Sequence, residues 1–144
     1  MSKRSLQIVL GILAIIPITT GLLGMLGVRD PPYVAAGVPP IVILDSNLRF
    51  YSGVWFGLGL ALYWVIPTIE RQTVLFRALW TMIFIGGIGR LLSMTMLAWP
   101  PVPFVAFTAL EIVGAPFFVL WQSRLSKTTN RHASMNIRIK TTHP

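Results

Sequence analysis

The sequence predicts an all-α integral membrane protein, a four-helix bundle of up-down-up-down topology with both termini in the cytoplasm. Of its 144 residues, 54% are hydrophobic and 11% are charged, and the mean hydropathy is +0.72. A soluble domain needs more polar side chains than this to cover its surface. Four apolar stretches each have the roughly 20 residues that a membrane-spanning helix needs. They cover residues 6–28, 48–69, 74–99 and 102–122.

The distribution of basic residues predicts the orientation in the membrane. Only Arg29 and Arg49 lie near the end of the bundle that carries the loop of residues 30–47, whereas nine basic residues lie at the end that holds both termini. These nine are Lys3, Arg4, Arg71, Arg77, Arg124, Lys127, Arg131, Arg138 and Lys140. By the positive-inside rule this second end faces the cytoplasm. We therefore expect a multi-pass protein of the bacterial inner membrane, and the net charge of +8 requires no nucleic-acid partner.

Residues 6–28 are expected to stay in the protein as the first helix rather than to be cleaved as a signal peptide. Lys3 and Arg4 resemble a basic n-region, but the uncharged run that follows exceeds the roughly 7 to 15 residues of a signal h-region. Gly21 and Gly24 lie near the outer end of this helix. Because small residues let a neighbouring backbone approach, we predict that both glycines pack against another helix.

The first connection, residues 29–47, is rich in proline but apolar in its second half. A disordered linker would be more polar. Long structureless loops are also uncommon in compact domains. We therefore predict a lid that folds back over the mouth of the bundle, with a position in the headgroup region as the alternative.

The second helix is predicted to begin at Asp45-Ser46-Asn47, a run of residue types that are favoured at a helix N-cap. Gly53 and Gly57 follow at the GxxxG spacing of a helix contact face. Arg49 lies on the same face one turn earlier. This helix is therefore predicted to pack through the face that carries its charge.

The third and fourth helices each place one charged residue on a face of small and polar residues. The members of these faces are Gly86, Arg90 and Ser93 in the third helix and Thr108, Glu111 and Gly114 in the fourth. We predict that Gly86 and Gly114 pack against other helices. Pro116 follows in the fourth helix, where a proline invites a kink. Glu70, in the connection before the third helix, is expected to be a solvated loop charge.

Arg90 and Glu111 are predicted to form an ion pair inside the membrane. Arg90 lies nine residues before Trp99, and Glu111 lies nine residues after Val102, so a tight hairpin separates them. At about 1.5 Å rise per residue, both charges reach the same depth, roughly 13 Å below that hairpin. A charge in the bilayer core is costly unless it is compensated, which makes the pair a candidate functional site.

The polar groups expected in the outer half of the bundle form one predicted cluster whose formal charges sum to zero. They are Asp45, Asn47, Arg49, Arg90, Ser93, Thr108 and Glu111. In one interpretation the charges only hold the helices in register and nothing is bound. In the other, the cluster is the floor of an outward-opening pocket that receives a polar head on an apolar body. The predicted walls of that pocket are Phe50, Trp55, Phe104 and Phe107.

Three polar segments carry a resemblance. They are the stretch of residues 45–53 (Asp-Ser-Asn-Leu-Arg-Phe-Tyr-Ser-Gly), the run Gly86-Gly87-Ile88-Gly89-Arg90, and Glu111. Over residues 6–125 the chain resembles the bacterial four-helix membrane family called domain of unknown function 4345. The recurring polar positions of that family correspond here to Asp45, Asn47, Arg49, Arg90 and Glu111. The resemblance therefore implies the same architecture and cluster, but no activity, because the family's name states none.

The predicted function is the binding of an amphiphilic small molecule or a partner membrane helix through the polar cluster. The arginines would hold an anionic or carbonyl head, and Glu111 would orient Arg90. The alternative is a membrane enzyme that uses Glu111 as proton donor or acceptor on a lipophilic substrate, although a nearby Arg90 favours the ionised carboxylate. A small proton-coupled exporter is less favoured, because such exporters avoid a strong basic bias.

Other chemistries lack the residues they need. The chain has no cysteine, and its two histidines, His132 and His143, lie in a basic tail of residues 126–144. We expect this tail to be disordered and cytoplasmic, outside a transmembrane domain of residues 1–125. No catalytic residue, metal site or cofactor is predicted, although a bound lipid or quinone stays open. The expected partners are the lipid bilayer, an amphiphilic ligand, and a membrane protein or a second copy of the chain.

Overall fold

The computed structural model describes residues 2–126, and all regular secondary structure in this range is helical. The chain divides into two compact units. Of the described residues, 7–67 form the N-terminal unit, and 2–6 together with 68–126 belong to the C-terminal unit. Of the predicted basic tail only Ser126 is described, so that prediction, with His132 and His143, lies outside the described residues.

Four helices of the described part are long and apolar enough to cross a membrane. They are Lys3–Gly24, Val42–Thr68, Thr73–Met96 and Val102–Ser126. Large apolar side chains such as Ile12, Ile85 and Leu120 are exposed along them, as expected when the surrounding solvent is hydrocarbon. The chain is therefore an all-α multi-pass membrane protein, and its four long helices are consistent with the predicted four-helix bundle.

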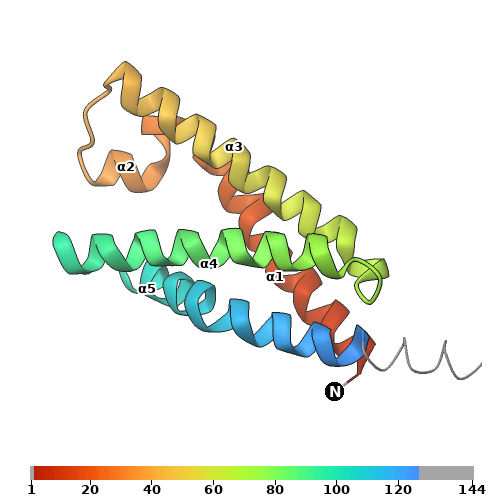
Figure 1. Cartoon of the computed structure of the whole chain (residues 1–144). Coiled ribbons are helices and arrows are strands. Elements are labelled where there is room, and N and C mark those ends of the chain that lie inside the picture. The colour runs from red at the N-terminus through yellow and green to blue at the C-terminus, as the bar shows by residue number, and fades with distance from the viewer. Residues whose placement is uncertain (1, 127–144) are drawn as a thin grey trace, which may run out of the picture. The chain divides into compact units, whose positions relative to one another are not determined.

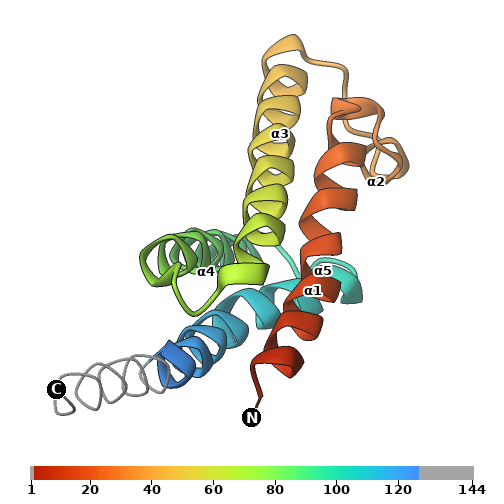
Figure 2. The ribbon, with the colours of Figure 1, turned by 90° about the vertical axis from the view of Figure 1, so that its right-hand side faces the viewer.

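In the N-terminal unit, α1 (Lys3–Gly24) and α3 (Val42–Val65) lie side by side and run antiparallel (Figure 2). Glycines set their closest approach. A Cβ added at Gly21 would lie 2.6 Å from the backbone nitrogen of Phe56, and one added at Gly59 would lie 2.8 Å from a side chain of α1. Neither position has room for a methyl group, so the two backbones meet directly, as in other small-residue helix contacts.

The glycines that make this contact differ in part from the predicted ones. Gly21 and Gly24 of α1 both lie against α3. On α3, however, Gly59 makes the contact, while Gly53 and Gly57 have no described atom within 4 Å of their added Cβ positions. Two residues along a helix turn the chain by about 200°, so Gly57 and Gly59 point to nearly opposite sides. The GxxxG face of α3 therefore does not face α1.

The connection between α1 and α3 is compact. It contains the 3-10 turn Gly27–Arg29 and the short helix α2 (Pro31–Ala35), and Figure 1 shows it at the end of this helix pair. The next helix, α3, starts at Val42, earlier than the sequence predicts, and its N-cap is Ile41. Asp45 therefore lies in the first turn of α3, where its carboxylate is free to bond elsewhere.

In the C-terminal unit, α4 (Thr73–Met96) runs antiparallel to the helix Val102–Ser126 (Figure 1). The second of these is not uniform. It begins as α5 (Val102–Ala109), passes through a π-helical turn at Leu110–Gly114, and continues as an α-helix to its end. The short connection before α4 contains the 3-10 turn Ile66–Thr68.

Aromatic rings and one buried amide hold the C-terminal unit together away from its hairpin. Trp80 of α4 packs on Phe118, with ring centroids 4.8 Å apart. Gln122 is fully buried, and its Nε2 donates hydrogen bonds of 2.9 Å to the carbonyl oxygen of Ile69 and to Thr73 Oγ1. These bonds join the start of α4 to the end of its neighbour. The hairpin between α4 and α5 connects the helix pair at the opposite end.

Candidate functional site

Arg90 and Glu111 form the ion pair that the sequence predicts. Arg90 Nε lies 3.1 Å from Glu111 Oε2, with the arginine side chain 38% exposed and the glutamate side chain 7% exposed. The pair joins α4 to the π-helical turn of the neighbouring helix. A carboxylate this deeply buried needs a compensating charge, and Arg90 supplies it.

Gly87 allows the two helices to approach at this pair. A Cβ added at Gly87 would lie 2.8 Å from the Cβ of Glu111 and 3.1 Å from Ile112. Gly87 precedes Arg90 by three residues, so both lie on one face of α4. The predicted packing glycine, Gly86, has no described atom within 4 Å of its added Cβ and points elsewhere. The glycine-rich run was a signal for close approach, but it did not show which glycine makes it.

Glu111 lies within the π-helical turn Leu110–Gly114. Pro116 follows and lacks the N–H that the carbonyl of Ile112 would accept in a regular α-helix. The wider turn is one way in which a transmembrane helix adapts to such a proline. Single π-helical turns are frequent at functional sites. At Gly114, at the end of the turn, the three atoms nearest to an added Cβ belong to side chains of the same helix, Leu110 and Phe118.

The hydrogen bonding of the pair is incomplete. The short Arg90–Glu111 contact does not have hydrogen-bond geometry, and Glu111 Oε2 is buried without a hydrogen-bond partner in the described part of the chain. Within residues 2–126, the contact with Glu111 is also the only polar interaction of the Arg90 side chain. The terminal nitrogens of this guanidinium therefore have donors to offer to another group.

Thr108 and Ser93, the two hydroxyl residues predicted near the pair, have different surroundings. Thr108 is buried, and its Oγ1 donates a 2.9 Å hydrogen bond to the carbonyl oxygen of Phe104 in its own helix. Ser93 is exposed on α4. The Thr108 hydroxyl has used its only hydrogen atom, so it can serve a ligand only as an acceptor.

Asp45 and Arg49 form a second ion pair, in the N-terminal unit. Arg49 Nε donates to Asp45 Oδ2 at 2.7 Å. The terminal nitrogens of Arg49 also donate to the carbonyl oxygens of Met25 and Leu26, at 2.8 and 3.0 Å. These carbonyls follow the end of α1, so the guanidinium acts as a C-terminal cap. The Leu26 carbonyl oxygen also accepts a 3.3 Å hydrogen bond from the backbone N–H of Arg29.

The Asp45 carboxylate completes this arrangement. Its Oδ1 accepts a 3.0 Å hydrogen bond from the backbone N–H of Val28. Gly27, next to it, has φ +66° and leaves no space for a side chain beside Asp45 and Arg49. Asp45 and Arg49 are therefore fully engaged in closing the first connection, while Asn47 is exposed. The seven residues predicted as one cluster thus contain two ion pairs, one in each unit.

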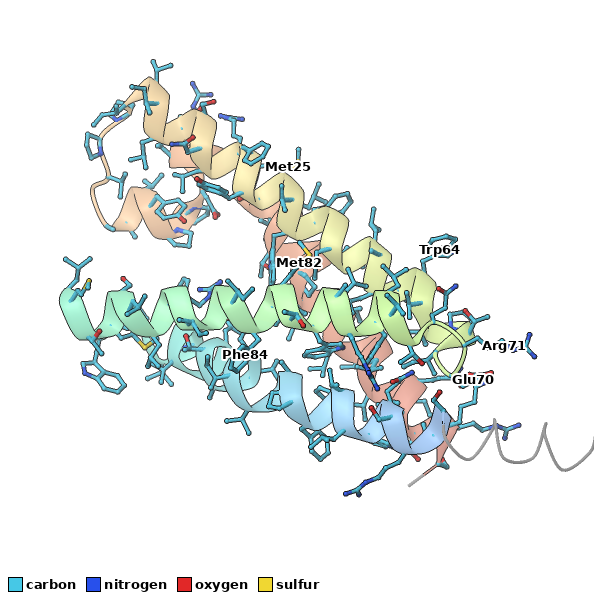
Figure 3. All side chains as sticks on the ribbon, in the orientation of Figure 1. Met25, Trp64, Glu70, Arg71, Met82 and Phe84 are labelled. Atoms are coloured by element: carbon cyan, nitrogen blue, oxygen red, sulfur yellow. The ribbon has the colours of Figure 1, made fainter. Side chains whose placement is uncertain are left out.

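The C-terminal unit also has a groove that the sequence analysis missed. It has a volume of about 240 Å³ and is lined by Trp80, Thr81, Phe84, Ala115, Pro116 and Val119. Phe84 lies on the side of α4 that faces the neighbouring helix (Figure 3). Of the predicted pocket walls, Phe104 and Phe107 pack edge to face at 6.4 Å, Trp55 Nε1 donates to Thr20 Oγ1, and Phe50 is exposed.

Glu70 is not the solvated loop charge that the sequence predicts. Its side chain is only 14% exposed, and its Oε1 accepts a 2.6 Å hydrogen bond from Lys3 Nζ within the C-terminal unit. Glu70 and Arg71 lie together in the connection before α4 (Figure 3). Burial raises the pKa of the Glu70 carboxyl, but the hydrogen bond from Lys3 and the nearby positive charges outweigh burial, so the pKa is lowered.

This lowered pKa gives a testable pH dependence. A carboxyl whose pKa is lower in the native state stabilises the fold above its unfolded pKa of 4.5, and the contribution disappears as the pH falls through the native pKa. We expect Glu70→Gln to reduce the unfolding free energy by about 1 kcal/mol or less at pH 7, since Lys3 is partly exposed. Thermal unfolding in detergent should show this difference at pH 7 and a much smaller one at pH 3. A difference that is unchanged at pH 3 would contradict the assignment, and Arg4→Gln serves as a control without effect.

Within residues 2–126, no group of three or more His, Cys, Asp or Glu side chains is arranged to hold a metal ion. The polar groups of the described membrane-spanning helices include the Asp45–Arg49 and Arg90–Glu111 ion pairs, the buried Gln122 amide, the Arg77 guanidinium, several hydroxyls and buried indoles. Such groups bind and orient polar atoms by hydrogen bonding and charge.

Comparison with known proteins identifies the family. The model of the family described as "Domain of unknown function (DUF4345)" matches residues 5–122. This range includes most of the four long helices and the Asp45–Arg49 and Arg90–Glu111 ion pairs. No curated protein and no solved structure matches the chain. Because the match covers most of the sequence, the chain belongs to the DUF4345 family.

Proposed function

We propose that this protein is a multi-pass protein of the inner membrane, with cytoplasmic termini, that binds an amphiphilic small molecule. The polar head of the molecule accepts hydrogen bonds from Arg90, and Glu111 holds the guanidinium in place. The apolar body lies along the transmembrane helices. Asp45 and Arg49 close the first connection and have no direct part in this binding.

The free donor groups of Arg90 carry the proposal. Its only polar contact among residues 2–126 is Glu111, at one edge of the guanidinium. Arg49, by comparison, donates four hydrogen bonds from its guanidinium, two to the Asp45 carboxylate and two to backbone carbonyls. Unsatisfied donors are costly in hydrocarbon, where water is not at hand to replace a missing partner. A carbonyl or other acceptor oxygen on a bound molecule would supply that partner.

Native mass spectrometry of the detergent-purified protein tests the proposal. We expect the wild-type protein to retain a small-molecule adduct. We expect Arg90→Gln to lower its occupancy about tenfold or more, the loss typical of a hydrogen bond from a charged group. Arg29→Gln, which removes an exposed arginine, is the matched control and should retain the adduct. A wild-type protein without an adduct, or equal retention in Arg90→Gln, would contradict the proposal.

Two other readings of the same site are distinguished by this measurement. A partner membrane helix could supply the acceptor oxygen instead, and the spectrum would then show a second polypeptide or a multimer in place of a small adduct. An enzyme is the second alternative, favoured by the buried Glu111 Oε2 that lacks a hydrogen bond. In that case Glu111→Gln would keep the adduct but prevent its chemical conversion.

The proposed orientation is open to a direct test, because the chain contains no cysteine. Ser2 and Ser46 are both exposed, and the proposed topology places them on opposite sides of the membrane. In intact cells a membrane-impermeant maleimide should label the Ser46→Cys variant and leave Ser2→Cys unlabelled until the membrane is permeabilised. The reverse pattern would mean that the termini face outward.

A further inference from the structure

Polar side chains join the start of α4 to the end of the helix Val102–Ser126, where Figure 1 shows the two helix ends side by side. Arg77 Nη2 donates a 3.0 Å hydrogen bond to Ser123 Oγ, and Thr73 Oγ1 lies 3.4 Å from Ser126 Oγ. On each helix the two residues are three or four positions apart, so the two contacts lie about one helical turn from each other. We call these four side chains the polar seam.

Arg77 has hydrogen-bond donors to offer at the polar seam. Its bond to Ser123 is the only polar interaction of its side chain within residues 2–126, so most of its N–H groups have no partner there. The Ser123 hydroxyl donates its own hydrogen to the carbonyl oxygen of Val119 and therefore serves Arg77 only as an acceptor. The missing partner of Arg77 is an acceptor, and a negatively charged one would also compensate its charge.

Ser126 offers one further hydrogen at the polar seam. Gln122 Nε2 donates to Thr73 Oγ1 at 2.9 Å, so the threonine can direct its own hydrogen to Ser126 Oγ. The hydrogen of Ser126 is then left without an acceptor in the described part of the chain. Donors on neighbouring turns, about 5 to 6 Å apart, can both reach the oxygen atoms of one phosphate group at hydrogen-bond distance.

The position of Arg77 along α4 corresponds to the depth of lipid headgroups. With 24 residues α4 is about 36 Å long, so each end of a centred helix extends about 3 Å beyond a hydrocarbon core of roughly 30 Å. Arg77 lies four positions, or about 6 Å, after the first residue of α4, and its side chain is exposed. A long arginine side chain reaches the interface from this depth, where the phosphate groups of lipids lie.

The charges at this end of the C-terminal unit favour a lipid with a net negative charge. The described charged side chains here are Lys3, Arg4, Glu70, Arg71, Arg77 and Arg124. The only acid among them, Glu70, is bonded to Lys3. Basic side chains at the membrane surface attract anionic lipids. A guanidinium also matches the geometry of phosphate, because its N–H groups can donate to two phosphate oxygens at once.

We propose that Arg77 and Ser126 bind the phosphate group of an anionic phospholipid. The guanidinium donates to the two unbridged phosphate oxygens, and the Ser126 hydroxyl donates to one of them. Arg90 follows Arg77 by thirteen residues, which is about 20 Å along α4, so the polar seam is separate from the Arg90–Glu111 pair. This inference therefore does not depend on the proposed function.

Native mass spectrometry of the full-length protein, titrated in detergent, measures the affinity for the first ligand bound. The probes are phosphatidylglycerol, phosphatidylcholine with the same acyl chains, and inorganic phosphate. We expect phosphatidylglycerol to bind about fivefold or more tightly than phosphatidylcholine, the effect of one basic side chain near the surface. Equal affinities for the two lipids would overturn the inference. If inorganic phosphate binds as tightly as phosphatidylglycerol, the ligand is a soluble anion and the assignment to a lipid is wrong.

Arginine variants locate the binding. We expect Arg77→Gln to weaken phosphatidylglycerol binding about tenfold and to remove the preference over phosphatidylcholine. Arg71→Gln is the matched control, because Arg71 is an exposed arginine at the same end (Figure 3), and its effect should be clearly smaller. An equal loss in the two variants would mean a general attraction to basic side chains and would overturn the inference.

Ser126→Ala tests the second donor and keeps the experiment decisive if Arg77→Gln fails to fold. We expect it to weaken phosphatidylglycerol binding about threefold, and Ser46→Ala, at an exposed serine, to have no effect. Unchanged affinity in both Arg77→Gln and Ser126→Ala would overturn the inference. Arg90→Gln should bind phosphatidylglycerol as the wild type does, which separates this site from the one proposed at Arg90.

Discussion

Arg90→Gln should destabilise the protein by about 3 kcal/mol, close to the loss that follows when one member of a buried ion pair is removed. The substitution leaves the Glu111 carboxylate buried among apolar side chains without a cation. The cost has an upper limit, because a carboxyl of ordinary pKa can be neutralised at pH 7 for about 3 to 4 kcal/mol. Thermal unfolding in detergent, or a reversible denaturation by detergent exchange, measures the loss.

Glu111→Gln should cost less than Arg90→Gln. The arginine side chain is partly exposed and long enough to turn its charged end toward more polar surroundings, which the buried glutamate is unable to do. The double variant should then lose clearly less than the sum of the two single losses, since neither charge remains. Losses that add fully would mean that the two side chains are not coupled. Arg29→Gln, at an exposed arginine, should change stability by no more than about 0.5 kcal/mol.

Much of the architecture could be predicted from the sequence because the membrane imposes simple rules. Hydrocarbon requires long apolar helices, so hydropathy alone located all four. The Arg90–Glu111 pair could also be predicted, because equal distances from one hairpin bring two residues to equal depth. Depth along a helix follows from counting residues, and counting does not depend on how the side chains pack.

The parts that could not be predicted depend on rotation about the helix axis and on the positions of helix ends. Gly59 rather than Gly57 contacts α1, and hydropathy does not distinguish two glycines on opposite sides of a helix. The capping role of Arg49 follows from where α1 ends, which no motif in the sequence marks. The groove at Trp80 depends on the side-chain packing of α4 and its neighbour, and its residues looked like ordinary apolar helix positions.

Glu70 shows a different limit of the sequence. A charged residue in a short polar connection is usually solvated, and nothing near it in the sequence suggests otherwise. Its partner, Lys3, is 67 positions away and meets it because the first residues of the chain belong to the C-terminal unit. Contacts between positions so far apart in the sequence depend on the whole fold. Local sequence patterns do not predict them.

Gly87→Ala should lower stability by about 1 to 3 kcal/mol, the usual cost of adding a methyl group to a packed contact. The new Cβ would lie 2.8 Å from the Cβ of Glu111, so α4 would have to move away from the π-helical turn and lengthen the ion pair. The adduct retained by the wild-type protein should decrease with it. Gly86→Ala is the matched control, because that position has no described atom within 4 Å.

At Gly86 the methyl group meets no neighbour, and alanine favours a helix over glycine by up to about 1 kcal/mol. We therefore expect Gly86→Ala to be neutral or slightly stabilising, with the adduct unchanged, although it differs from Gly87→Ala by one position. Helix propensity, lipid contact and expression level should affect both substitutions in the same way. A loss of stability in Gly87→Ala together with a gain in Gly86→Ala would therefore point to the contact with Glu111. Equal changes in stability for the two variants would mean that Gly87 does not face Glu111. The close approach of the two helices at the ion pair would then be contradicted.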